Sequence, residues 1–266
     1  MTGRPAGRID MRLDPRGDSG VVAYVTVANP ARLNTLTGAL MAEFVHAVRA
    51  LGARDDLRAV VLCGEGEKAF IGGADIRELA ALDTTTATAF IEKVHGCCQA
   101  LRDLPVPVIA RMRGYTLGAG LEIAAACDLR IAADTAVFGM PEVCIGIPSV
   151  VEAALLPGLI GWGRARRMML LGETIGAAEA LAWGLVERVT PPAALDAAVA
   201  EWVDRLLANG RTALAAQKAL MRAWESLPMD QAIAAGIPAF ADAFRTDEPA
   251  RMMRAFLDRP RRRPAG

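Results

Sequence analysis

The 266-residue sequence has no excess of charge of either sign, because 30 Lys and Arg residues balance 30 Asp and Glu residues. Without a net charge, the chain has no overall field that would attract nucleic acid or an anionic membrane, so a basic binding site would have to be local. Histidine is scarce as well. His46 and His95 lie in helical patterns, where surface positions without partners are expected. Ser149 has no base paired with it, and a Ser–His triad is therefore unsupported.

The five cysteines lack the paired C-x-x-C spacing of a zinc site, and their odd number does not suit a disulfide framework. Most of them lie in apolar runs, so we expect buried free thiols and a reducing compartment. They are Cys63, Cys97, Cys98, Cys127 and Cys144.

Long apolar runs are also missing. The longest are interrupted by Glu122, Glu152 or Pro157 and fall short of a bilayer span. The N-terminal stretch mixes Arg with Asp and has no apolar core, unlike a signal peptide. These absences predict a soluble, cytoplasmic protein.

What the sequence does have is apolar content: 53% of its residues are hydrophobic and 23% are charged, which is ample for a globular core. Buried strand, loop and helix alternate as far as Ser149, a pattern that favours an α/β fold with parallel pairing. Strands are expected at residues 8–13, 20–28, 59–63, 105–112, 128–133 and 136–138, and helices at 37–52, from 75, at 86–101 and at 119–127. Beyond Ser149 the pattern is almost wholly helical, with one strand-like interruption at residues 185–189.

Large apolar residues recur at helical spacing near the C-terminus. Two interpretations are open: these residues either form an oligomer interface or cap the core of their own chain. They are Trp202, Leu206, Leu207, Leu220, Trp224, Phe240, Phe244, Met252, Met253 and Phe256.

A glycine-rich turn, Gly118-Ala119-Gly120, lies between a predicted strand and a predicted helix. Small residues at such a turn let backbone N–H groups approach a ligand oxygen, as an oxyanion site or a phosphate site requires. The turn also resembles a dinucleotide-binding G-x-G-x-x-A start, with Asp134 as the ribose-binding acid. Against that interpretation, Glu122 would lie in the first helical turn and repel the pyrophosphate.

A second turn of small residues, at positions 71–75, also precedes a predicted helix. The two turns could each supply one N–H group to a single carbonyl oxygen and so stabilise an enolate. The alternative is that Gly72 and Gly73 only make a tight turn and that Asp75 only caps the helix.

Glu122 and Glu142 are twenty residues apart, and both have apolar flanks. A buried glutamate is costly unless it is paired or used. Two neighbouring carboxyl groups push one pKa upward, so that one group stays protonated as an acid while the other serves as a base. The pair therefore predicts acid–base chemistry in a dry site.

Six motifs occur in an order that resembles the crotonase superfamily, the enoyl-CoA hydratase/isomerase family, over nearly the whole chain. They are Leu33-Asn34-Thr35-Leu36, Ala69 to Ile76, Pro107-Val108-Ile109-Ala110, Gly114 to Glu122, Cys127-Asp128 and Phe138 to Glu142. The resemblance implies an α/β fold with a ββα spiral core over residues 1–195. It also implies a helical C-terminal region, residues 196–266, that completes the core and builds homotrimers, commonly paired into hexamers.

The activity implied by the resemblance is that of an enoyl-CoA hydratase. Such an enzyme adds water syn to a 2-enoyl-CoA and gives a 3-hydroxyacyl-CoA, through an enolate held in an oxyanion hole. The resemblance implies an acyl-CoA substrate and no metal or redox cofactor, coenzyme A being part of the substrate.

The resemblance also assigns roles to particular residues. The N–H groups of Ala74 and Ala119 would form the oxyanion hole, and Glu122 and Glu142 would be the two catalytic glutamates. The substrate-binding positions implied are Leu33, Thr35, Gly73, Asp75, Ile76, Leu117, Gly118, Pro141 and Gly146, with Leu117 and Pro141 at the acyl end.

The segment Ser149–Leu155 departs from the family pattern. Hydratases of this family usually have a glycine-rich run here that ends near Thr-Gln-Arg, whereas this chain has bulky residues and an additional carboxylate, Glu152. Glu152 is expected to be an ordinary charge at a helix N-terminus. The altered segment leaves two alternatives open: a double-bond isomerase or another acyl-CoA reaction of the family, and a CoA-thioester-binding protein without activity.

Overall fold

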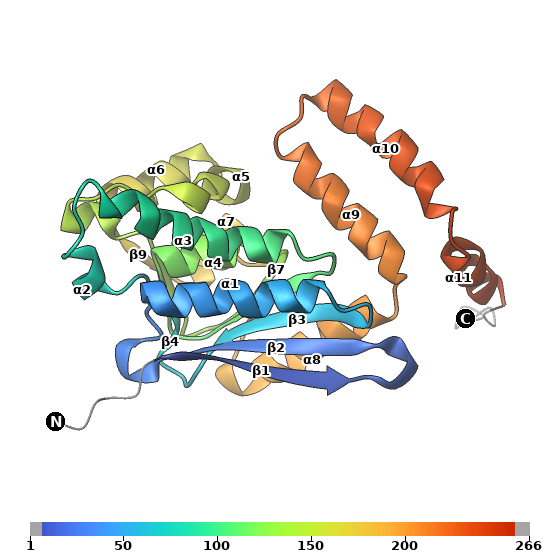
Figure 1. Cartoon of the computed structure of the whole chain (residues 1–266), viewed down its shortest axis with the longest axis horizontal. Helices are drawn as coiled ribbons and strands as arrows, with labels where there is room; N and C mark the ends of the chain where they lie inside the picture. Colours follow the sequence, from blue (N-terminus) through green and yellow to red (C-terminus); the bar gives the residue numbers. More distant parts are fainter. Residues whose placement is uncertain (1–6, 259–266) are drawn as a thin grey trace, which may run out of the picture. The chain divides into compact units, whose positions relative to one another are not determined.

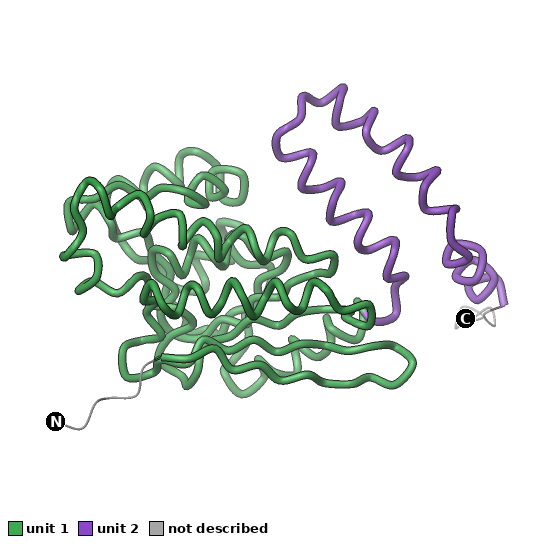
Figure 2. Tube along the Cα trace, in the orientation of Figure 1, with its two compact units in different colours: residues 1–206 green, residues 207–266 purple. Residues whose placement is uncertain are grey.

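The computed structural model describes residues 7–258. It contains two compact units, one up to Leu206 and one from Leu207 (Figure 2). The boundary expected at residues 195 and 196 falls at the start of helix α8 (Leu195–Leu207), and the two units divide at the end of that helix.

A six-stranded sheet with the order β1-β2-β3-β5-β7-β10 forms one layer of the first unit (Figure 1). Strands β1 and β2 are antiparallel, and all the other neighbours in this sheet are parallel. The strands are β1 (Arg8–Pro15), β2 (Val21–Ala28), β3 (Leu57–Gly64), β5 (Val108–Met112), β7 (Leu129–Ala133) and β10 (Arg188–Thr190). Continuous apolar runs such as Ala59 to Leu62 are buried, which is typical of parallel strands covered on both faces.

A second sheet has the order β4-β6-β8-β9 and carries the glycine turns. Its strands are β4 (Ala69–Ile71), β6 (Tyr115–Leu117), β8 (Val137–Gly139) and β9 (Thr174–Gly176), and only the β8–β9 pair is antiparallel. The sequence pattern missed β4, β6 and β9, because three residues are too few to show an alternation. The strand expected at 185–189 begins at Arg188, since Leu185 and Val186 are buried in the turn before it.

Helices α1 (Gly38–Gly52) and α3 (Thr86–Arg102) run side by side over the larger sheet (Figure 1). Thr37 caps α1 as predicted, its side chain accepting a hydrogen bond from the Leu40 amide. All eight residues of α4 (Ala119–Ala126) are buried, so this helix is internal and places Glu122 inside the protein.

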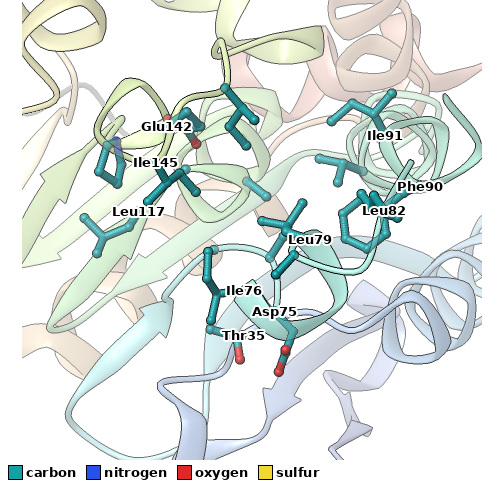
Figure 3. Close-up of a pocket in the computed structure, with 18 of the residues that line it drawn as sticks. Thr35, Asp75, Ile76, Leu79, Leu82, Phe90, Ile91, Leu117, Glu142 and Ile145 are labelled. Carbon is teal, nitrogen blue, oxygen red and sulfur yellow. The ribbon is translucent and has the colours of Figure 1, made fainter. Parts of the chain in front are cut away.

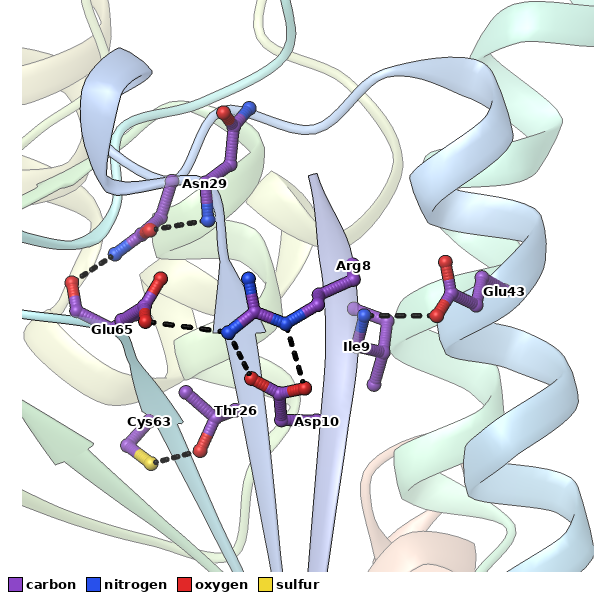
Figure 4. Close-up of polar contacts among 9 residues, drawn as sticks. Arg8, Ile9, Asp10, Thr26, Asn29, Glu43, Cys63 and Glu65 are labelled. Carbon is purple, nitrogen blue, oxygen red and sulfur yellow. Dashed lines mark hydrogen bonds and ion pairs between the residues drawn. The ribbon is translucent and has the colours of Figure 1, made fainter. Parts of the chain in front are cut away.

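Short helices complete the first unit. They are α2 (Ile76–Leu79), α5 (Leu156–Ile160), α6 (Trp162–Leu171), α7 (Ala177–Trp183), and the 3₁₀ turns η1 (Gly17–Ser19), η2 (Pro30–Arg32), η3 (Glu142–Ile145), η4 (Val151–Leu155) and η5 (Pro192–Ala194). At the edge of the sheet, the Ile9 amide donates to Glu43 of α1, and Arg8 pairs with Asp10 and Glu65 (Figure 4). These contacts tie the exposed strand β1 to its neighbours.

The second unit consists of α9 (Arg211–Trp224), α10 (Met229–Ala243) and α11 (Glu248–Leu257). Many of its large apolar side chains are exposed in the single chain. The exposed ones include Met229, Ile233, Ile237, Phe240, Phe244, Met253, Phe256 and Leu257.

All five cysteines are free, but their burial differs from the expectation at one position. Cys97, Cys98 and Cys127 are buried and Cys63 is partly buried, whereas Cys144 is exposed because it lies in η3 on the surface. Within residues 7–258, no helix is long and apolar enough to cross a membrane.

Candidate active site

A cavity of about 1370 Å³ opens in the first unit where the second sheet meets α2 and α3 (Figure 3). Twelve of the thirteen residues predicted for the site line it, among them Glu122, Glu142, Ala74 and Ala119. The exception is Gly146, whose neighbours Ile145 and Ile147 line the cavity instead. The fold therefore brings both glycine turns and both glutamates to one place.

The two turns follow β4 and β6, which are parallel neighbours, so both leave the same edge of the sheet. The amides around them are occupied: Asp75 donates to Leu36 and Gly118 donates to Gly139. Within the described residues, the amides of Ala74 and Ala119 donate to no other backbone group. Two free donors beside the cavity suit an acceptor that a ligand brings.

Glycine is required at Gly118 for two reasons. Its φ of +52° lies in the left-handed region, and a Cβ added there would lie 2.4 Å from Glu142 Oε1. Gly120 is equally constrained, because a Cβ would meet the Ile71 carbonyl oxygen at 2.0 Å. These close approaches hold α4 against β4 and bring Glu142 over the start of α4.

Glu122 is 3% exposed and lies in the first turn of α4. Burial and, to a smaller extent, the carboxylates of Glu142 and Glu152 raise its pKa to about 8, against the lowering effect of the backbone amides of Ala153 and Val150. Glu122 therefore holds a proton at neutral pH.

Glu142 begins η3 directly after β8 and Pro141. Burial raises its pKa, while hydrogen bonds from its own amide and from Ser149 lower it. The Ser149 hydroxyl donates to Glu142 Oε2 over 2.9 Å, so this serine orients a carboxylate and belongs to no triad. Two carboxyl groups in different surroundings can then take different protonation states.

Asp75 has the capping role that the sequence left open. It accepts from the amides of Arg77 and Glu78 at the start of α2, and it pairs with Arg32 at 3.0 Å. Burial alone would raise the pKa of Asp75, but these hydrogen bonds lower it below its usual value. Asp75 thus fixes the backbone beside Ala74.

One wall of the cavity is apolar and was not predicted as part of the site. It is formed by Leu79, Leu82, Phe90, Ile91 and Val94, from α2, the following loop and α3 (Figure 3). No motif marks these residues; only the helical spacing of Phe90 and Val94 indicates a buried face.

The expectations for His95 and Glu152 were wrong in part. His95 is on the surface as predicted, but it has a partner: its Nδ1 lies 2.8 Å from Glu152 Oε1. Glu152 is 7% exposed, because η4 packs its side chain inward against α3 and α4. Among residues 7–258, no cluster of three or more His, Cys, Asp or Glu residues could hold a metal ion.

A family model described as enoyl-CoA hydratase/isomerase matches residues 17–264. The chain is 34% identical to the "Short-chain-enoyl-CoA hydratase" of Clostridium acetobutylicum, over 90% of this chain and 92% of that protein. It is 33% identical to the "Crotonyl-CoA hydratase" of Syntrophomonas wolfei, with the same coverage of both chains. Among solved structures, an enoyl-CoA hydratase of Mycobacterium smegmatis matches with a TM-score of 0.88 and 30% identity, over 96% of this chain and 98% of that one.

Proposed function

This chain belongs to the enoyl-CoA hydratase/isomerase family and has its crotonase-type α/β fold, and from that premise we propose that it hydrates 2-enoyl-CoA thioesters to 3-hydroxyacyl-CoA. The observation that carries the proposal is the meeting of two carboxyl groups and two unoccupied backbone amides in one cavity. The protein is thus an enzyme of the hydro-lyase type.

In the proposed reaction, the thioester carbonyl oxygen accepts hydrogen bonds from the amides of Ala74 and Ala119. These donors draw electrons from the conjugated double bond and stabilise the enolate. Glu122 and Glu142 face the α- and β-carbons. One glutamate takes a proton from water as the oxygen bonds to the β-carbon, and the other delivers a proton to the α-carbon.

One glutamate can act as the acid and the other as the base because the pair holds one proton before the substrate binds. In the free protein it resides on Glu122, whose pKa is raised to about 8. Glu122 gives this proton to the α-carbon while Glu142 holds the proton taken from water, and that proton returns to Glu122 before the next turnover. Over the full cycle, water supplies both the hydroxyl group and the hydrogen of the product. The reaction therefore needs no metal or redox cofactor, and coenzyme A is part of the substrate.

The remaining predicted site residues serve substrate binding in this proposal. Leu33, Thr35 and the turn from Gly73 to Ile76 line the part of the cavity assigned to coenzyme A. Leu117 and Pro141, which line the same cavity, are assigned to the acyl end. The apolar wall of the cavity favours an apolar acyl group over a charged one.

The test is the loss of the conjugated-thioester absorbance with a panel of 2-enoyl-CoAs of increasing chain length. Glu122→Gln and Glu142→Gln should each lower kcat by about 10² to 10⁴, the usual contribution of general acid–base catalysis. Glu92→Gln, which changes an exposed carboxylate on α3, is the matched control and should keep full activity. Absence of activity at every chain length, or full activity in both site variants, would refute the proposal.

Double-bond isomerisation remains the second candidate, and one observation favours it. Val150 lines the cavity, and it lies in the segment for which the family resemblance implies glycines, so its side chain restricts the room for water there. An isomerase needs one glutamate to shuttle a proton. In that case Glu142→Gln would abolish turnover of a 3-enoyl-CoA, while Glu122→Gln would have a mild effect.

We also propose that the protein is a homotrimer, or a dimer of trimers, in the cytoplasm. The exposed apolar residues of α10 and α11 support assembly, since an exposed surface of this kind is unfavourable in a monomer. Five free thiols support a reducing compartment. Light scattering of the protein and of an Ile237→Asp, Phe240→Asp double variant tests the assembly; a monomer in both samples would contradict it.

A further inference from the structure

The buried carboxylate of Glu152 is the feature that the proposed reaction leaves unused. Its side chain is 8% exposed, and its Oε1 contacts His95 Nδ1 at 2.8 Å. Its Oε2 has no hydrogen-bond partner within the described residues. Burying a carboxylate with one oxygen unsatisfied is costly, so the surroundings must hold it in place.

The segment around Glu152 is strained as well as buried. Val151 has a φ of +41°, a conformation that a β-branched residue rarely adopts. The strained residue lies directly before Glu152, whose contact with His95 joins η4 to α3. We take this contact as the anchor that keeps the strained turn in its conformation.

The same segment touches both candidate catalytic groups. The Ser149 hydroxyl donates to Glu142, and the amides of Val150 and Ala153 lie against the Glu122 carboxyl group. The side chain of Val150 lines the cavity. A shift of the segment would therefore move the hydrogen bonds of Glu142 and Glu122 together.

We propose that Glu152, anchored by His95, is a positioning residue that holds segment 149–153 so that Glu122 and Glu142 keep their working geometry. The inference rests on the proposed function for its kinetic consequences. Glu152 does not line the cavity, so it acts through this segment and through its charge, without touching substrate.

The ionisable groups around Glu152 are few. From α3 they are His95, Cys97 and Cys98, and from α4 there is Glu122; α5 contributes none. Burial raises the pKa of the Cys97 thiol to about 12 and that of Cys98 well above its usual value, with Glu152 adding to both, so the thiols stay neutral. The charge of Glu152 is then a further cause that keeps Glu122 protonated.

The kinetic test compares Glu152→Gln and His95→Gln with wild type, and uses His46→Gln, an exposed histidine on α1, as the matched control. Glu152→Gln should lower kcat by about one to two orders of magnitude, because small displacements of catalytic groups have effects of that size. KM should stay near the wild-type value. The alkaline limb of the kcat profile should move to lower pH, since Glu122 loses a neighbouring negative charge.

A purely structural role would instead lower the unfolding midpoint and leave the pH profile unchanged. Wild-type kcat and an unmoved alkaline limb in folded Glu152→Gln would overturn the inference. If Glu152→Gln does not fold, His95→Gln decides, because a half-exposed side chain can be changed with little effect on folding; unaltered kcat in that variant would also overturn it.

Carboxyl-¹³C NMR titration of Glu122 separates this inference from the proposed function. The titration needs no turnover, so it applies even if the wild-type protein hydrates nothing. A lower midpoint for Glu122 in Glu152→Gln than in wild type supports the inference. Equal midpoints would overturn it, whatever the enzymatic result.

Discussion

Gly118→Ala tests the geometry of the site with the smallest change available. Gly118 has a φ of +52° and a ψ of −124°, a backbone conformation that an alanine adopts only at a cost of about 1–3 kcal/mol. The added Cβ would also lie 2.4 Å from Glu142 Oε1, so the carboxylate must move by roughly 1 Å to reach van der Waals contact. A displacement of that size at a catalytic group is expected to lower kcat by about 10²-fold.

Gly17→Ala is the matched control for the backbone strain. Gly17 has a φ of +56°, and a Cβ there meets nothing within 4 Å. Both variants should lower Tm, by about 2–4 °C per kcal/mol for a chain near this size. Only Gly118→Ala should lose hydration activity, measured by the absorbance of a 2-enoyl-CoA. Equal activity in the two variants would refute the assignment of Glu142 to the reaction.

Three further predictions concern charge, capping and the apolar wall. The pKa of Glu122 is about 8 in the folded protein, above its value in the unfolded chain, so the wild-type protein loses stability as pH rises from about 5 to about 8. Glu122→Gln has no such proton to lose, so thermal melts should show it gaining stability relative to wild type over this range. Asp75→Ala should cost about 1–2 kcal/mol in denaturant unfolding, because α2 loses its cap, and its kcat should fall with it. Phe90→Ala should raise KM for long-chain substrates more than for short-chain ones. An unchanged pH dependence, an unchanged unfolding midpoint, or equal changes in KM would count against the respective argument.

The sequence predicted those parts of the fold that have strong local signals. Thr37 and the spacing of Leu40, Met41 and Phe44 define α1, and the structure confirms both its cap and its buried face. The strands β4, β6 and β9 were missed because each has only three residues and pairs with a strand far away in the chain. The Gly118 amide donates a hydrogen bond to the Gly139 carbonyl oxygen, a contact that no local sequence pattern predicts.

The position of the site was predictable, but its electrostatics were not. Motifs placed Glu122 and Glu142 together, because each follows a strand of what proved to be one sheet. The partnership of His95 with Glu152 joins residues 57 positions apart and depends on how η4 packs. From the sequence, His95 is expected to be a surface residue without a partner and Glu152 an ordinary charge at a helix terminus, since neither has a motif of its own.

The most direct test of the account follows where the hydrogens go. A 2-enoyl-CoA is converted in D₂O, and the product is examined by NMR. With wild-type protein, one deuterium is expected at the α-carbon, added on the same face as the β-hydroxyl group; Glu122→Gln and Glu142→Gln should not give this product at the wild-type rate. Deuterium at the γ-carbon with a shifted double bond, or no incorporation at all, would contradict the proposed function.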